Sequence, residues 1–219
     1  MKKHVPNLLT CINLGIGALG IYVVFTINRD FAIYFVMAAS VFDFLDGFTA
    51  RILNVKSAFG KELDSLADLT SFGLLPCFFM LEWLEAKSSF FFVAILIGIF
   101  SSLRLAKFNL DDEQSYQFKG LPTPANAIML TSLVFLSFEL GEKVLLIICV
   151  VSSLLLVSNL KLLAIKFEHF RWNGNQWRYV LMASSIAMIM VFKWTFLPFL
   201  IPFYLVISTL SNLKRIQPK

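Results

Sequence analysis

The sequence predicts an all-α membrane protein, a polytopic helix bundle with about eight transmembrane helices. Of its 219 residues, 58% are hydrophobic and 15% are charged, whereas an ordinary soluble domain has a lower apolar fraction and more charge. The apolar residues gather in runs of about 20, the length that a helix needs to cross a bilayer. Short polar turns separate the runs, and no linker or low-complexity stretch divides residues 1–219, so we expect a single domain.

The expected helices follow one another through the chain. The first span covers about 7–27, and the second runs from about 31 into an acidic stretch whose first two aspartates lie in its last turns. The remaining spans are expected at about 62–84, 90–109, 125–140, 144–160, 179–192 and 195–213. Polar turns of a few residues join most of them, and a basic and aromatic loop of 161–178 precedes the seventh.

The basic residues fall unevenly on the two sides of this arrangement. Of the 19 Lys and Arg residues, fifteen lie on the side that holds both chain ends and the acidic stretch, and four lie on the other. Basic residues are enriched on the cytoplasmic side of membrane proteins. We therefore expect an integral protein of the cytoplasmic (inner) membrane with both termini and the acidic stretch facing the cytoplasm. The net charge of +5 then reflects basic loops near anionic lipid, not nucleic-acid binding.

The stretch from Asp43 to Asp68 holds the candidate site. It reads D-F-L-D-G-F-T-A-R and, eight residues later, G-K-E-L-D-S-L-A-D. Asp43 and Asp46 are three residues apart, and Asp64 and Asp68 are four apart, so each pair shares one face of a helix. Charged side chains are costly within a membrane and indicate a functional site with a positive partner.

Two kinds of positive partner are compatible with these residues. The aspartates could pair with Arg51, Lys56 and Lys61, or they could bind one or two divalent cations. Mg²⁺, Mn²⁺ and Ca²⁺ prefer oxygen ligands, and the stretch contains no His or Cys for zinc. Gly47 and Gly60 leave room for a ligand beside the backbone, and the planar guanidinium of Arg51 suits a phosphate.

The stretch resembles the signature of the CDP-alcohol phosphotransferase family, D-x-x-D-G-x-x-A-R-x8-G-x3-D-x3-D. Its eight fixed positions are filled by Asp43, Asp46, Gly47, Ala50, Arg51, Gly60, Asp64 and Asp68. The resemblance implies a membrane enzyme that transfers a phosphatidyl or similar group from a CDP-linked donor to an alcohol and releases CMP.

The resemblance also implies a role for each residue of the signature. The ligands of two Mg²⁺ or Mn²⁺ ions would be Asp43, Asp46, Asp64 and Asp68, and Asp68 would also be the general base. The residues that bind the CDP-linked donor would be Gly47, Ala50, Arg51, Ser57 and Gly60. The family resemblance further suggests a homodimer.

Three further segments resemble the phosphatidylserine synthase branch of the family. They read S-F-G-L-L-P at 71–76, R-L-A-K-F-N at 104–109 and F-K-G-L-P-T-P-A at 118–125, and the opening P-N-L-L-T at 6–10 is similar too. Lys107 and Asn126 depart mildly from the residues usual in the branch. The resemblance implies CDP-diacylglycerol as the donor and L-serine as the acceptor.

Four residues of these segments are candidates to bind the serine carboxylate or a phosphate. They are Arg104, Lys107, Asn109 and Lys119. Arg104 ranks first because its guanidinium matches the geometry of a carboxylate.

Two alternatives remain open. A sister transferase could use glycerol phosphate or inositol phosphate, although a phosphorylated acceptor would need more basic residues facing the site than an amino acid does. A cation transporter could also place carboxylates in helices, although transporters usually show internal repeats and broken helices near mid-membrane. In this sequence the aspartates are expected near one face of the membrane, and no internal repeat is visible.

Overall fold

The computed structural model describes residues 4–55, 57–110, 120–160, 162–163, 172 and 175–216, with side chains up to 211. Every regular element in these ranges is a helix, so the all-α prediction is confirmed. The long helices are α1 (His4–Thr26), α2 (Ala32–Ile52), α3 (Ala58–Asp68), α4 (Leu75–Glu85), α5 (Ile95–Leu110), α6 (Thr123–Thr131), α7 (Glu142–Val157), α8 (Gln176–Phe192) and α9 (Leu197–Ile216). Shorter elements extend or join them: η1 (Arg29–Phe31), the π-helical η2 (Leu69–Leu74), η3 (Phe91–Ala94), η5 (Ser132–Phe135) and η6 (Lys193–Phe196).

Membrane-spanning length is reached by five helical segments within the described ranges. They are His4–Thr26, Arg29–Ile52, Ala58–Glu85, Phe91–Leu110 and Gln176–Ser211, and a shorter apolar helix covers Thr123–Phe135. The last of the five is a hairpin of α8 and α9 that turns at η6, so the expected number of about eight spans is approximate.

One expected helix boundary near the acidic stretch was wrong. The third helix begins at Ala58 instead of near Glu62, because the Ser57 Oγ accepts a hydrogen bond of 3.0 Å from the Gly60 N–H and caps it. The second helix ends at Ile52, just before the connector that was expected from about Asn54.

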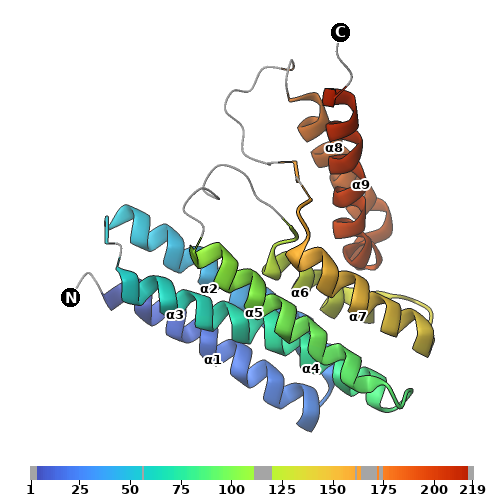
Figure 1. Ribbon diagram of the computed structural model, residues 1–219, viewed down its shortest axis with the longest axis horizontal. Helices are drawn as coiled ribbons and strands as arrows, with labels where there is room; N and C mark the ends of the chain where they lie inside the picture. The colour runs from blue at the N-terminus through green and yellow to red at the C-terminus, as the bar shows by residue number, and fades with distance from the viewer. Residues whose placement is uncertain are drawn as a thin grey trace.

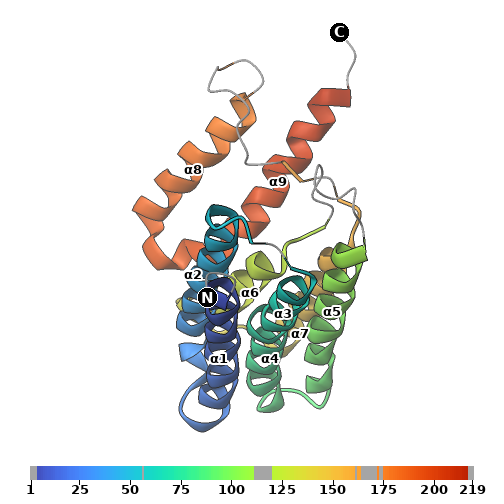
Figure 2. The same ribbon diagram turned by 90° about the vertical axis from the view of Figure 1, so that its left-hand side faces the viewer.

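A continuous helical rod, formed by α3, η2 and α4, lies at the centre of the bundle. It passes between α1 on one side and α5 on the other (Figure 1, Figure 2). Its side chains Phe72, Leu75, Phe79, Met80 and Leu84 are fully buried and form much of the main core. Beside this bundle, α8 and α9 form a hairpin that stands off at an angle, and α9 contacts α6 (Figure 1).

The π-helical segment η2, directly after Asp68, packs closely against both α1 and α5. A Cβ on Gly17 of α1 would lie 2.3 Å from the Ser71 Oγ, and one on Gly73 would lie 3.0 Å from the Ser101 side chain of α5. Only glycine allows these helices to approach so closely. The end of α3 is therefore held tightly between α1 and α5.

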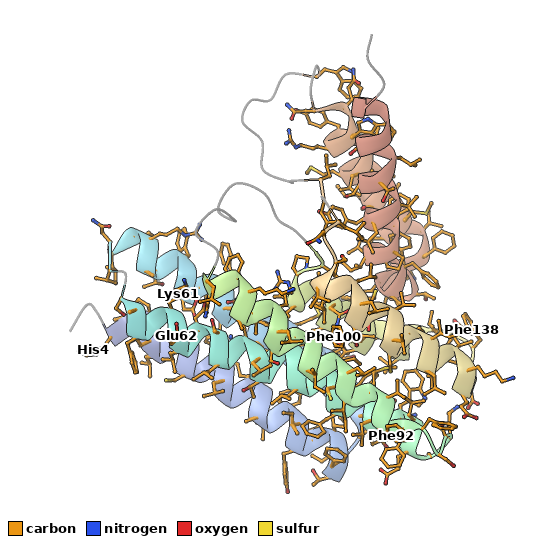
Figure 3. All side chains as sticks on the ribbon, in the orientation of Figure 1. His4, Lys61, Glu62, Phe92, Phe100 and Phe138 are labelled. Atoms are coloured by element: carbon orange, nitrogen blue, oxygen red, sulfur yellow. The ribbon has the colours of Figure 1, made fainter. Side chains whose placement is uncertain are left out.

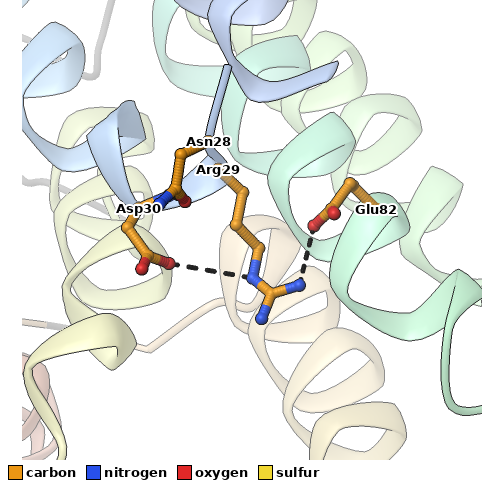
Figure 4. A network of polar contacts seen from close by, with 4 residues as sticks. All are labelled: Asn28, Arg29, Asp30 and Glu82. Carbon is orange, nitrogen blue, oxygen red and sulfur yellow. Dashed lines mark hydrogen bonds and ion pairs between the residues drawn. The ribbon is translucent and has the colours of Figure 1, made fainter. Parts of the chain in front are cut away.

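A polar network ties the turn after α1 to α4, at the end of α1 away from its N-terminus (Figure 4). Arg29 donates to Glu82 across 2.9 Å, and its Nε lies 3.8 Å from the Asp30 carboxylate. The guanidinium also lies over the Trp83 ring, 5.0 Å from its centroid. This network stabilises the end of the bundle that lies opposite the signature aspartates.

Candidate active site

Three of the four signature aspartates form one cluster between α2 and α3. Asp43, Asp64 and Asp68 each offer a carboxylate oxygen, and these oxygens all lie within 4.8 Å of one another. The short connection from Ile52 to Ala58 turns the chain back, and the four-residue spacing puts Asp64 and Asp68 on one face of α3. The structure thus brings together residues from both halves of the signature.

Asp46 lies outside this group of three. It is buried, and its Oδ2 accepts a hydrogen bond of 2.7 Å from the Thr10 Oγ1 of α1. It lines a cavity that Asp64 also lines. Because Asp64 belongs to both, the carboxylate cluster and the cavity adjoin.

Within the described ranges, none of the four aspartates has a Lys or Arg within ion-pair distance. The Arg51 Nε donates instead to the Gly47 carbonyl across 3.0 Å, and the Lys61 Nζ donates to the Asn109 carbonyl across 2.7 Å; Lys56 lies outside the described residues. The sequence left open whether the aspartates pair with basic side chains or with divalent cations. Within the described residues, Arg51 and Lys61 do not form such ion pairs.

The carboxylate oxygens themselves fit a divalent cation. The Oδ1 atoms of Asp64 and Asp68 are buried and have no hydrogen-bond partner. A buried carboxylate oxygen without a partner costs free energy, and clustered carboxylates repel one another. A hard divalent cation that takes oxygen ligands removes both penalties.

The cavity beside the cluster has a volume of about 680 Å³ and opens among α1, α2 and α3. Its described lining residues are Pro6, Asn7, Thr10, Asp46, Gly47, Ala50, Asn54, Val55, Ser57, Ala58, Gly60, Lys61 and Asp64. Four of the five expected donor residues are among them, namely Gly47, Ala50, Ser57 and Gly60. Arg51 is exposed and does not line the cavity.

The sequence reasoning assigned no role to several lining residues. Pro6, Asn7 and Thr10 come from α1, and their only signal was the P-N-L-L-T opening that resembles the serine branch. Lys61 was considered solely as an ion-pair partner of the aspartates, yet it lines the cavity itself.

The expected acceptor residue Arg104 lies close to the cluster. Its charge interacts with that of Asp68, its Nη1 donates to the Thr123 Oγ1 across 3.2 Å, and its Nε is buried without a partner. Thr123, which the sequence reasoning did not single out, thus orients this guanidinium. Arg104 and Lys107 also line a small cavity of about 50 Å³ at the end of α7.

The other two acceptor candidates differ in what the structure shows. The Asn109 Nδ2 donates to the Ser65 Oγ across 2.8 Å, so its amide links α5 to α3. Lys119 lies outside the described residues.

The Gly-Leu-Pro segment before α6 packs against the end of α7. Gly120 has φ +77°, and a Cβ there would lie 2.7 Å from the Leu156 carbonyl oxygen. The Gly120 and Leu121 N–H groups donate to the carbonyls of Leu160 and Leu155. Glycine is required at this close approach, and the contact positions Thr123 opposite Arg104.

The chain is similar in sequence to known proteins of one family. Residues 3–157 match the family model described as CDP-alcohol phosphatidyltransferase. The chain is 33% identical over 196 residues to the CDP-diacylglycerol–serine O-phosphatidyltransferase of Helicobacter pylori (strain ATCC 700392 / 26695), which covers 84% of this chain and 81% of the relative.

Relatives of the same name occur in other organisms. Identity is 36% over 173 residues with that of Bacillus subtilis (strain 168), covering 77% of this chain and 92% of the relative. It is 31% over 159 residues with that of Methanocaldococcus jannaschii, covering 72% of each.

The cluster predicts that Asp43→Asn or Asp64→Asn weakens Mn²⁺ binding. Losing a ligand should cost more than the roughly 10–100-fold typical of a lost supporting partner. Electron paramagnetic resonance titration of the purified protein measures the free Mn²⁺. Glu62→Gln is the matched control, because Glu62 is an exposed carboxylate on α3 outside the cluster. Equal affinities in all variants would refute the metal site.

Proposed function

The chain belongs to the CDP-alcohol phosphatidyltransferase family, and we propose that it is a CDP-diacylglycerol–serine O-phosphatidyltransferase, which makes phosphatidylserine and CMP for phospholipid biosynthesis. One observation carries the proposal. A cluster of carboxylates with unpaired oxygens adjoins a cavity of about 680 Å³ that the expected donor residues line. The relatives from Helicobacter pylori and Bacillus subtilis are named for their action on this donor and on serine.

The cavity is the proposed site of the CDP portion of the donor. Gly47, Ala50 and Gly60 present little or no side chain there, so a nucleotide can approach the backbone of α2 and α3. The first turn of α3 lies at the cavity, and helix N-termini favour phosphate groups. Ser57 keeps this turn in place as its cap, and Arg51, one turn from Gly47, lies outside the lining and is proposed to meet the donor at the rim.

The reaction transfers the phosphatidyl group in one displacement. The serine hydroxyl oxygen forms a bond to the phosphorus linked to diacylglycerol, and the bond from that phosphorus to the CMP oxygen breaks. Asp68 takes the hydroxyl proton as general base. Its Oδ1 is buried and has no hydrogen-bond partner, so this oxygen is able to accept a proton.

Asp43, Asp64 and Asp68 are the residues that would hold Mg²⁺ or Mn²⁺, and Asp46 is the proposed fourth ligand at the cavity wall. A divalent cation bound by these carboxylates would neutralise charge on the donor phosphates and on the leaving CMP. A contact within the protein also holds Asp46 in place, since its carboxylate accepts a hydrogen bond from Thr10. We propose two ions for the site.

Arg104 is the proposed partner of the serine carboxylate. Its Nε is free to donate, while Thr123 holds the Nη1, and a guanidinium binds a carboxylate through two parallel hydrogen bonds. Lys107 and Lys119 are weaker candidates for the same anion. Asn109 more directly holds α5 against α3 through Ser65.

The acceptor is tested by measuring CMP release from CDP-diacylglycerol with the purified protein. L-Serine should exceed glycerol 3-phosphate and inositol phosphate by at least about tenfold, because a site built to bind the charged groups of one substrate discriminates against others. Faster release with either phosphorylated alcohol would overturn the serine assignment and leave the family intact.

Asp68→Asn should lower kcat by about 10²–10⁴-fold, the usual cost of losing a general base. Binding of CDP-diacylglycerol, measured by equilibrium titration, should change far less, because Asn keeps one oxygen that can bind a cation and loses the basic carboxylate. Asp30→Asn, at the opposite end of α1, is the control. Normal turnover by Asp68→Asn would exclude the base role.

The several apolar helices identify a membrane protein, and we propose that the site and both termini face the cytoplasm. The basic residues, fifteen against four, support this orientation. Green fluorescent protein fused after Lys219 should therefore fluoresce, since it matures in the cytoplasm. Activity of a reporter that works only in the periplasm, fused at the same position, would contradict the orientation.

A further inference from the structure

We propose that Lys61 is a further donor-binding residue, whose ammonium group binds the pyrophosphate of the CDP-linked donor. The inference rests on the proposed function and adds a residue that the family signature does not contain. It starts from the charges that surround the cavity.

Lys61 is the one Lys or Arg among the described residues that line the cavity. It lies in the first turn of α3, next to Gly60 and three residues before Asp64, both of which also line the cavity. Figure 3 places it at the end of the bundle that holds His4, far from Phe92 and Phe138. The lysine thus stands where the proposed nucleotide site meets the carboxylate cluster.

A pyrophosphate in this cavity needs positive charge from the protein as well as from bound cations. The cavity wall includes Asp46 and Asp64, which would repel the donor phosphates. Arg51 does not line the cavity, and its Nε is occupied by the Gly47 carbonyl. Lys61 is therefore the described side chain best placed to offset this repulsion.

The present partner of Lys61 leaves it able to bind an anion. Its Nζ donates to the Asn109 carbonyl across 2.7 Å, and the side chain is exposed. An ammonium group has three donors, so two remain for a ligand. A phosphate is also a stronger partner than a neutral carbonyl, because in an ammonium–phosphate hydrogen bond both the donor and the acceptor are charged.

If Lys61 had a purely structural role, its hydrogen bond to Asn109 would serve to link α3 to the end of α5. The same two helices are also linked through the Asn109 Nδ2 and the Ser65 Oγ, 2.8 Å apart. Ser65→Ala removes this second link and leaves the ammonium group in place. It is therefore the matched control for a loss of helix packing.

Equilibrium binding of CDP and of cytidine to the purified protein, with Mn²⁺ present, separates the two roles. Lys61→Ala and Lys61→Gln should weaken CDP binding by about 10- to 100-fold, the cost of a lost charged hydrogen bond. Cytidine, which lacks phosphate, should bind all variants alike, and Lys61→Arg should retain most of the CDP affinity. Ser65→Ala should lower the melting temperature without changing CDP affinity.

Two results would overturn the proposal. CDP affinity unchanged in Lys61→Ala and Lys61→Gln would leave the lysine a structural link, and an equal loss of CDP and cytidine binding would indicate a damaged cavity. The readout is binding and does not depend on the acceptor. Wild-type protein that binds CDP but does not react with serine would refute the proposed acceptor alone, whereas wild-type protein that binds no CDP would refute the proposed function and this inference together.

Discussion

The half-buried carboxylate cluster is the constraint on which the rest of the structure depends. Asp43, Asp64 and Asp68 place oxygens within 4.8 Å of one another among apolar helices, and no described Lys or Arg forms an ion pair with them. Ionised carboxylates in such surroundings are costly without a positive partner. A fold that holds them in this way favours a bound cation, which would offset phosphate charge in the proposed reaction.

The helices around the cluster are rigid on one side and open on the other. Directly after Asp68, the rod passes so close to α1 that Gly17 has no room for a Cβ beside Ser71, and Phe72 is fully buried. On the other side, the first turn of α3 borders a cavity of about 680 Å³. Tight packing thus fixes the carboxylates on one side, while the cavity on the other side is an accessible place for the proposed donor.

The basic side chains near the site donate to neutral groups of the protein, so their charge remains available to anions. Lys61 donates to the Asn109 carbonyl, and Arg104 donates to the Thr123 hydroxyl. A neutral partner orients a cationic side chain without cancelling its charge. In the proposed reaction the aspartates can therefore bind divalent cations, and Lys61 and Arg104 can bind the donor phosphates and the serine carboxylate.

The sequence by itself determined the helical class and the family, and it predicted the four aspartates as the site, because these depend on local features. Apolar runs of helix length and carboxylates spaced three or four residues apart can be read directly along the chain. It missed the cap at Ser57, which moved the start of α3, and it assigned no function to Thr10, Lys61 or Thr123. Only the tertiary structure separated Asp46 from the other three aspartates, through a hydrogen bond to a residue 36 positions away, and placed Lys61 against Asn109, 48 positions away. Such contacts depend on how helices distant in the chain pack together, and helical periodicity contains no record of that packing.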